Sequence, residues 1–150
     1  MPPLTIHEHT HDGNNSRRVN FKDINQRSLF VYWTIPGIQA ATATNYGVIF
    51  TSPVNGYIKS ITEVHQTLGT NGSPVTLNIE KLTGTQALDA GVEVLQTAFD
   101  LKASINVVRT GIISYTTSRS ALSIGDRLAL KDTGTLTSVA NVTVVIEIIY

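Results

Sequence analysis

The stretch NVTVVIEIIY, residues 141–150, decides the fold class of this chain. An apolar side chain occupies every second position, at Val142, Val144, Ile146 and Ile148. Successive side chains of a β-strand point to opposite faces of a sheet, so this spacing predicts a strand with one face in a hydrophobic core. Valine and isoleucine are also β-branched, which favours strands over helices. The sequence therefore predicts a half-buried strand at residues 141–150.

Similar alternation recurs through residues 28–150, between turn signals such as Asn55-Gly56 and Asn71-Gly72. In each of three predicted strands, alternate residues are expected to lie on one face of the sheet. These sets are Leu29, Val31, Trp33 and Ile35; Ile58, Ser60, Thr62 and Val64; and Val75, Leu77, Ile79 and Lys81. Short strands are also expected at residues 46–51 and 127–131. About eight strands separated by turns indicate an all-β, antiparallel β-sandwich, and their number fits a jelly roll.

One segment departs from the strand pattern. In TQALDAGVEVLQTAFDLK, residues 85–102, apolar side chains stand at helix-like intervals. They are Ala87, Leu88, Val92, Leu95 and Phe99. Gly91 interrupts this pattern and the valines favour strands. We expect a short helical turn in this segment.

Composition narrows the class of function. Charged residues make up 15% of the chain, with 11 basic and 11 acidic side chains, so the formal net charge is zero. Nucleic-acid binders usually carry a basic excess, and a neutral surface favours association because repulsion is weak. The absence of cysteine excludes disulfides and thiolate metal sites. No apolar run approaches the ~18 residues of a membrane span, and no secretory signal pattern is present, so we expect synthesis in a host cytoplasm.

The composition changes near residue 28. Residues 1–27 contain three of the four histidines, several arginines and few large apolar side chains. Such a segment has too little apolar surface to fold by itself. We therefore expect an extended N-terminal arm at residues 1–27 and a β-sandwich domain at residues 28–150.

The arm contains the stretch HEHTHDGNNS, residues 7–16, with histidines at positions 7, 9 and 11. Alternate side chains of a strand stand ~6.6–6.8 Å apart, which is too far for three imidazoles to close on one ion with bonds of ~2.0–2.1 Å. A trimer could bring His9 and His11 of each copy to a shared axis. We expect no metal and no other cofactor, with this trimer-axis site as the alternative, and interpret the stretch as an arm held against a partner surface.

Motifs for catalysis are missing from the sequence. It contains no G-x-S-x-G, P-loop, G-x-G-x-x-G or H-E-x-x-H pattern. His65, beside Glu63 and Gln66, is interpreted as a half-buried or interface histidine rather than a catalytic base. Asp126 and Arg127 are expected to cap a loop or contact a neighbouring subunit. We expect that the chain is not an enzyme; the enzyme alternative needs a cluster of acid and base groups or a metal inside the barrel.

Two parts of the chain resemble known proteins. HTHDGNNSRRVNFKDI, residues 9–24, resembles an H-x-H-x-G-x-x-S segment with a V-x-(H/F)-x-D-(L/I) tail met in virion proteins of tailed bacteriophages. The stretches YGVIF…LTGTQ, residues 46–86, and GDRLA…VVIEI, residues 125–148, are similar to small β-rich phage structural proteins. That group includes capsid decoration proteins, head fibres and tail-fibre modules, in which such domains commonly trimerise and an N-terminal arm often anchors them.

The resemblance implies a decoration, or cement, protein on the exterior of the virion. A homotrimer would bridge subunits of the major capsid protein through its arms, with apolar side chains buried and polar side chains hydrogen-bonded. The expected contact residues are His7, His9, His11, Asn14, Asn15, Arg17, Arg18, Val19, Phe21 and Ile24. Neither nucleic acid nor a membrane is an expected partner.

The alternative is a head-fibre or tail-fibre/baseplate module that binds a receptor on the host surface, such as a glycan. That function predicts exposed aromatic or polar loop tips. The candidates are Tyr46, Tyr57, Tyr115 and the loop residues around Asn71. Copy number separates the two functions, since a decoration protein is present in hundreds of copies and a tail component in a handful.

Overall fold

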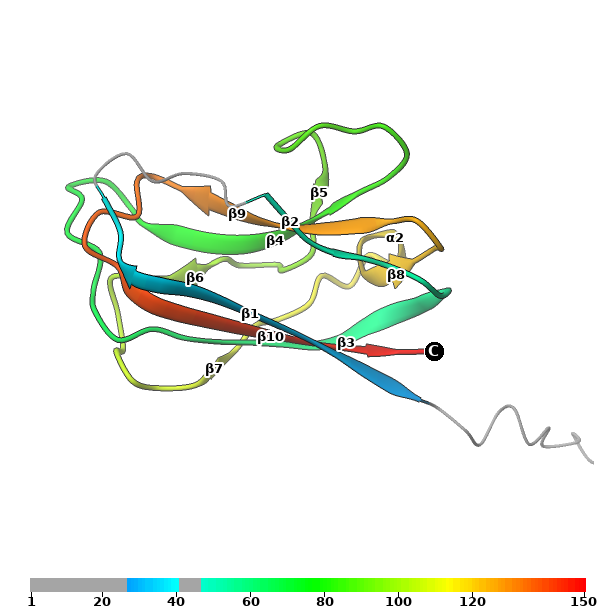
Figure 1. Ribbon diagram of the computed structural model, residues 1–150, viewed down its shortest axis with the longest axis horizontal. Helices are drawn as coiled ribbons and strands as arrows, with labels where there is room; N and C mark the ends of the chain where they lie inside the picture. Colours follow the sequence, from blue (N-terminus) through cyan, green and yellow to red (C-terminus); the bar gives the residue numbers. More distant parts are fainter. Residues whose placement is uncertain (1–26, 41–46) are drawn as a thin grey trace, which may run out of the picture.

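The computed structural model describes residues 27–40 and 47–150, and in this part the chain is almost entirely β-structure. Figure 1 shows two layers of strands with a short helical turn at one end. The elements are β1 (Ser28–Ile38), β2 (Gly47–Thr51), β3 (Gly56–Val64), β4 (Thr76–Leu82), β5 (Val92–Glu93), β6 (Phe99–Asp100), β7 (Arg109–Thr110), α2 (Thr117–Ser120), β8 (Ala121–Leu122), β9 (Arg127–Thr133) and β10 (Ala140–Ile149). No helix in these ranges is long and apolar enough to cross a membrane.

The strands form two antiparallel sheets, which we name sheet A and sheet B. Sheet A has the order β1-β10-β3, and both β7 and β8 pair with β3. Sheet B has the order β2-β9-β4, and both β5 and β6 pair with β4. Strands β1 to β4 alternate between the sheets, as do β9 and β10. This is the jelly-roll order, with β5 and β6 sharing one strand position and β7 and β8 sharing another, so the predicted fold class is confirmed.

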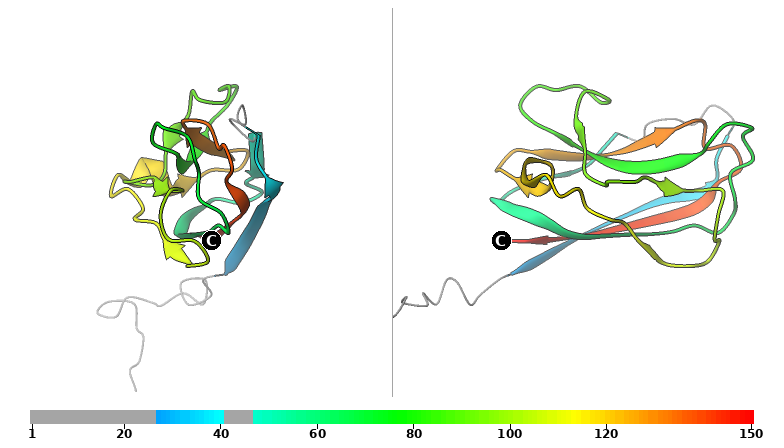
Figure 2. Two further views of the ribbon diagram at one scale, coloured as in Figure 1. Left: turned by 90° about the vertical axis from the view of Figure 1, so that its left-hand side faces the viewer. Right: turned by 180° about the vertical axis from the view of Figure 1, so that it is seen from behind.

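Strand β10 has the alternation of buried and outward side chains that the sequence predicts. Its inward side chains, Val142, Val144, Ile146 and Ile148, are all buried between the sheets. Strand β10 is the second strand of sheet A, with β1 on one side and β3 on the other. Figure 2 shows the two layers from the end and from behind. Burial of this one face against sheet B is the main reason why the register is fixed, because a slip by one residue would turn all four inward side chains outward.

Strand β3 departs from simple alternation. Glu147 lies opposite Ser60 and Ile148 lies opposite Ile58, so β3 has one extra residue in a β-bulge at this point. Ile58 is buried before the bulge, whereas Ile61 and Glu63 are buried after it. The prediction that Ser60, Thr62 and Val64 share the face of Ile58 is therefore wrong. The bulge places the carboxylate of Glu63 in the core.

The segment 85–102 contains no helix, so the predicted helical turn is wrong. The segment forms turns, β5 and β6 along one side of sheet B, and the helical turn of the described chain lies later, at α2. Asp89 has a φ of 67°, outside the right-handed helical region. A Cβ atom on Gly91 would stand 2.5 Å from the carbonyl oxygen of Lys81. The segment packs too closely against β4 for a helix to fit.

Candidate functional sites on two sides of the sandwich

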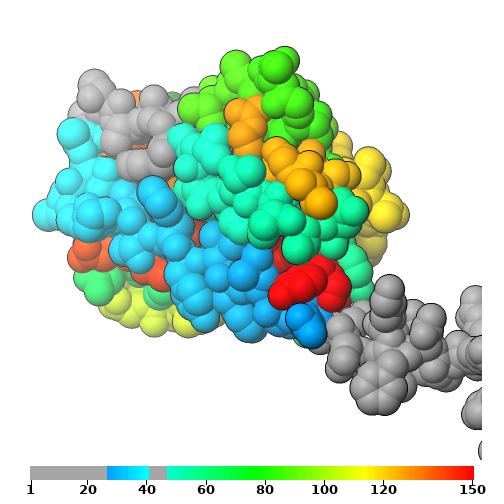
Figure 3. Space-filling model, turned by 45° about the vertical axis from the view of Figure 1, so that its right-hand side comes forward, coloured from blue at the N-terminus to red at the C-terminus, as the bar shows by residue number. Residues whose placement is uncertain are grey.

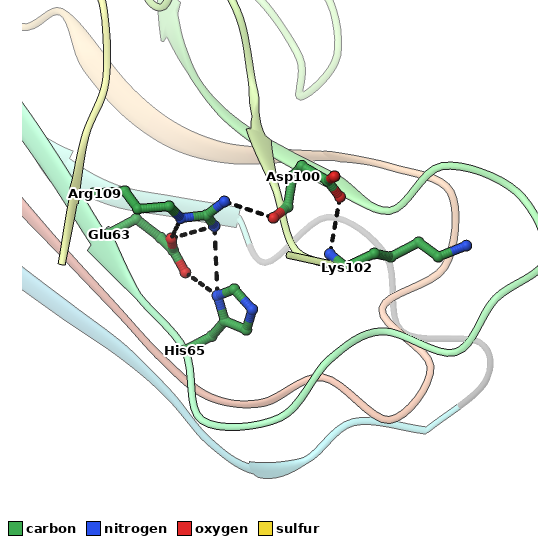
Figure 4. A network of polar contacts seen from close by, with 5 residues as sticks. All are labelled: Glu63, His65, Asp100, Lys102 and Arg109. Carbon is green, nitrogen blue, oxygen red and sulfur yellow. Dashed lines mark hydrogen bonds and ion pairs between the residues drawn. The ribbon is translucent and has the colours of Figure 1, made fainter. Parts of the chain in front are cut away.

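A buried polar cluster joins β3 to β7. The carboxylate of Glu63 is enclosed by protein, and its Oε1 lies 2.8 Å from Nδ1 of His65. Its Oε2 accepts hydrogen bonds from Nε and NH2 of Arg109 at 3.0 Å and 2.5 Å. Figure 4 shows these side chains converging from the two strands and the loop that follows β3. A buried carboxylate is stable only when paired and hydrogen-bonded, and here an arginine fork supplies both conditions.

His65 contacts both charged partners of the cluster through one ring nitrogen. Its Nδ1 atom lies 2.8 Å from Oε1 of Glu63 and 3.4 Å from NH2 of Arg109, and the short contact with the acceptor carboxylate favours a hydrogen on Nδ1. The Nε2 atom is buried and has no hydrogen-bond partner among the described residues. The side chain is fully buried rather than half-buried as predicted. The histidine therefore orients the carboxylate that Arg109 binds, and no hydroxyl of the described chain stands in line with Nε2 as a nucleophile would.

Arg109 connects this cluster to β6. Its NH1 atom donates to the carbonyl oxygen of Asp100 at 2.7 Å, and its guanidinium stands over the ring of Phe99 at 5.6 Å. Asp100 also accepts a hydrogen bond from the backbone N–H of Lys102, as Figure 4 shows. The backbone N–H of Asn106 donates to the carbonyl of His65. The cluster thus holds residues 99–109 against sheet A as an internal cross-link between the two sheets.

A second set of buried polar side chains lies on β4, which is buried on both faces. Glu80 accepts backbone hydrogen bonds from Asp89 at 2.9 Å and Gly91 at 3.3 Å. Lys81 donates to the backbone carbonyls of Ser118 and Ala121. Glu80 and Lys81 lie on opposite faces of β4, so Glu80 holds the beginning of the long connection between β4 and β8 from one face and Lys81 holds its end from the other. We name residues 83–122, which include β5 to β8, the covered side of the sandwich.

The opposite side of the sandwich is formed by β1 and β2, and we name residues 28–38 and 47–51 the β1–β2 edge. Within the described chain β1 pairs with β10 alone and β2 with β9 alone, so both are edge strands. Neither contains a charged residue. Its exposed large apolar side chains are Phe30, Tyr32, Ile38 and Val48, and half-buried Leu29, Trp33, Ile49 and Phe50 pack on the core beneath them. Figure 3 shows β1 and β2 next to each other on one face.

The predicted contact residues of the arm, from His7 to Ile24, lie outside the described residues, and so does Tyr46. The other receptor candidates do not form one patch. Asn71 lies in the loop between β3 and β4, at the opposite end of the sandwich from α2 (Figures 1 and 2). Its side chain bonds to Thr135 and to the backbone of Ser73, so it serves its own loop. Tyr115, just before α2, and Tyr57, at the start of β3, are exposed.

The turn before β9 has the predicted capping role. Oδ2 of Asp126 accepts a hydrogen bond from the backbone N–H of Ser123 at 2.9 Å. NH2 of Arg127 donates to the carbonyls of Gly84 and Gln86, which holds the start of the covered side. Lys81 is on the apolar face of its strand, as the alternation predicts. The roles of Glu63, Glu80 and Arg109 were not predicted from the sequence. The pattern that could have indicated them is a charged residue within an otherwise strand-like run of residues.

Comparisons with known proteins give a fold relationship. No protein-family model matches the chain, and no curated protein sequence matches it. Among solved structures, a chain in "Cyanophage Pam1 capsid asymmetric unit" is similar with a TM-score of 0.51 and 14% identity. A chain in "Capsid of Ralstonia phage GP4" is similar with a TM-score of 0.53 and 14% identity. Each match covers 83% of this chain and 84% of the other. At this identity the likeness establishes a shared fold.

Proposed function

We propose that the chain is a structural protein of a bacteriophage virion and that it decorates the outside of the capsid. The observation that carries this proposal is the fold shared with chains from two phage capsid structures over 83% of this chain. The match covers nearly the whole of both chains, so it concerns a complete domain rather than a few strands. The resemblance of residues 9–24, 46–86 and 125–148 to phage structural proteins supports the same assignment independently.

The proposed mechanism is cementing of the shell. The β-sandwich forms a trimer, and the arm of each copy lies across neighbouring major capsid subunits. Val19, Phe21 and Ile24 would be buried there, while Asn14 and Arg18 would add hydrogen bonds. Three linked arms bind more firmly than one, since each further arm binds at a high effective concentration. The shell would then resist the pressure of packaged DNA.

A structural rather than catalytic role is part of this proposal. The histidine–carboxylate pair of the described chain, His65 and Glu63, is fully buried. Its carboxylate is already engaged by Arg109. A general base must reach the proton of a bound substrate, and this pair instead holds two sheets together. An activity screen with purified protein that detected turnover, abolished by His65→Gln without unfolding, would contradict this assignment.

Reconstitution on capsids tests the proposed function. Capsids assembled from the phage's major capsid protein are incubated with the full chain or with a variant that lacks residues 1–26. The full chain is expected to bind in hundreds of copies and raise the temperature at which capsids break. The truncated variant is expected to lose most binding while keeping the far-ultraviolet circular dichroism of the β domain. Capsids that resist heat equally well without the protein would exclude a cement role.

The second candidate is a fibre or baseplate module that binds a host glycan. One observation favours it: Tyr115 is 87% exposed, and Tyr57 is 45% exposed at the same end of the sandwich as α2. Exposed aromatic rings are suited to stacking on sugar rings. A virion with only a handful of copies, together with loss of host-cell adsorption in Tyr115→Ala, would favour this function over decoration.

A further inference from the structure

The β1–β2 edge has the properties of a surface made for pairing. An edge strand presents a row of unpaired backbone donors and acceptors, and proteins usually protect it with charges, proline, bulges or a short length. From Ser28 to Ile35 the register of β1 with β10 is uninterrupted, and the irregularity near Pro36 comes only after it. Strand β2 is five residues long and has a register shift between Val48 and Phe50, so β1 is the less protected of the two strands. No charged residue stands anywhere in β1 or β2.

The side chains of the edge agree with its backbone. Phe30 is 48% exposed and Tyr32 is 68% exposed, and their ring centroids stand 6.3 Å apart on the outer face of β1. Large exposed apolar patches on native proteins mark interaction surfaces. The aromatic pair therefore adds a desolvation gain to the hydrogen bonds that the strand itself can offer.

The charges around the edge indicate what can cover it. The residue paired with Phe30 on β10 is charged, and it is Glu147. This carboxylate already accepts hydrogen bonds from Lys59, Ser28 and Ser60, so it offers little to a charged partner. The complement of an uncharged apolar edge is another uncharged apolar edge, and a second copy of the chain provides one. The zero net charge adds no repulsion between copies.

We infer that the β1–β2 edge is the surface through which copies of this chain associate. A closed ring of three requires a heterologous contact, in which two different parts of the surface meet. The β1 side of one copy then packs on the β2 side of the next, and both sides are uncharged. Residues 1–26 lead directly into β1, so copies that meet along this edge also bring their arms together for capsid binding. The inference rests on the proposed oligomeric decoration function and names its interface.

Tyr32→Glu in the full chain tests the inference. A carboxylate at this position would have to be desolvated without a partner when two edges meet. Light scattering after size-exclusion chromatography is expected to give the mass of a trimer for the natural chain. The variant is expected to shift to the mass of a single chain and to need at least about tenfold more protein to associate. Thr34→Lys, the next outward position on β1, should give the same shift.

Tyr115→Glu is the matched control, because it makes the same change at an exposed tyrosine outside the edge. It is expected to keep the mass of the natural chain. Circular dichroism checks that all three variants retain the β domain, and capsid binding is measured in parallel. A Tyr32→Glu variant that associates normally overturns the inference; if it also fails to bind capsids, the edge is covered by capsid protein.

The two proposals fail in different ways. A natural chain that stays single at all concentrations, yet binds capsids, overturns the inference and leaves the decoration function standing. A chain whose association depends on Tyr32, but which binds no capsid, supports the inference and removes the decoration function.

Discussion

The edge strands on the two sides of the sandwich differ in length and in charge. On the covered side the strands β5, β6 and β7 are each two residues long, and each contains a charged residue. Buried Glu63, Glu80 and Lys81 bind the backbone and side chains of this side. On the β1–β2 edge the strands are longer and uncharged. Polar side chains therefore hold the covered side in place within the chain, while the β1–β2 edge is the side that we propose makes apolar contact with a partner.

The largest effect is expected from removing Arg109, which breaks the covered side at its centre. Arg109→Met leaves the carboxylate of Glu63 buried without its cation, and breaking a buried pair in this way costs about 3 kcal/mol. Equilibrium unfolding in urea measures the loss. Arg119→Met is the control, since this arginine makes one long bond to the carbonyl of Glu93 and should cost below about 1 kcal/mol.

The double variant Glu63→Leu, Arg109→Met sharpens this test. It removes both charges from the same place, so it should regain much of the stability lost in Arg109→Met. If Arg109→Met unfolds at the same urea concentration as the natural chain, the cluster does not hold the covered side in place.

A smaller loss of stability is expected from Gly91→Ala, because the added methyl group would push the covered side away from β4. The new Cβ atom would stand 2.5 Å from the carbonyl oxygen of Lys81, a backbone atom that cannot turn away. Such overpacking costs about 1–3 kcal/mol. Gly72→Ala is the matched control, because nothing lies within 4 Å of its Cβ position. It should leave the urea midpoint unchanged or raise it slightly. Equal midpoints for the two variants would mean that the close approach at Gly91 is not rigid.

The difference between the two sides also explains what sequence can predict. Strand β10 was predictable because a single period of two runs along it, with Val142 and Ile146 on the same face and no interruption. The inward face of β1 followed for the same reason, and Val31 and Ile35 are buried. Period two fails at β3 because one extra residue in a bulge changes the parity, and no local signal marks Lys59 as that residue.

The covered side was not predictable, because its conformation is set by distant residues. Leu88 and Leu95 stand at helical spacing, but the backbone between them is held by Glu80 of β4. The strands β5 and β6 are too short to show a period. The lack of charge in residues 28–35 was visible in the sequence, but only the sheet order shows that β1 is an edge strand. The arm residues singled out from sequence stay a prediction.

A still smaller effect on stability is expected where a charge is added to the β1–β2 edge. Tyr32 is mostly exposed, so Tyr32→Glu in dilute protein should change the free energy of unfolding by less than about 0.5 kcal/mol. A charge change should lower the free energy of unfolding strongly in Arg109→Met on the covered side. In Tyr32→Glu on the β1–β2 edge it should hardly change this free energy while the chain is not associated. Urea unfolding below the association concentration measures it. A loss above about 1 kcal/mol would show that Tyr32 supports the domain itself.

The smallest effect concerns acid sensitivity next to the edge. Hydrogen bonds from Lys59 and then Ser28, with a further bond from Ser60, hold the pKa of Glu147 below its ordinary value of 4.5. A carboxyl group whose pKa is lower in the folded than in the unfolded state stabilises the fold above the unfolded value, and this stabilisation is lost as pH falls through the folded value. The natural chain should therefore lose slightly more stability than Glu147→Gln between pH 5 and about pH 2. The group is partly exposed to solvent, so salt should weaken the difference. Parallel pH profiles for the two proteins at low salt would mean that Glu147 is bound no better in the folded chain than in the unfolded one. It would then be free for a cationic partner, contrary to an edge that selects an uncharged one.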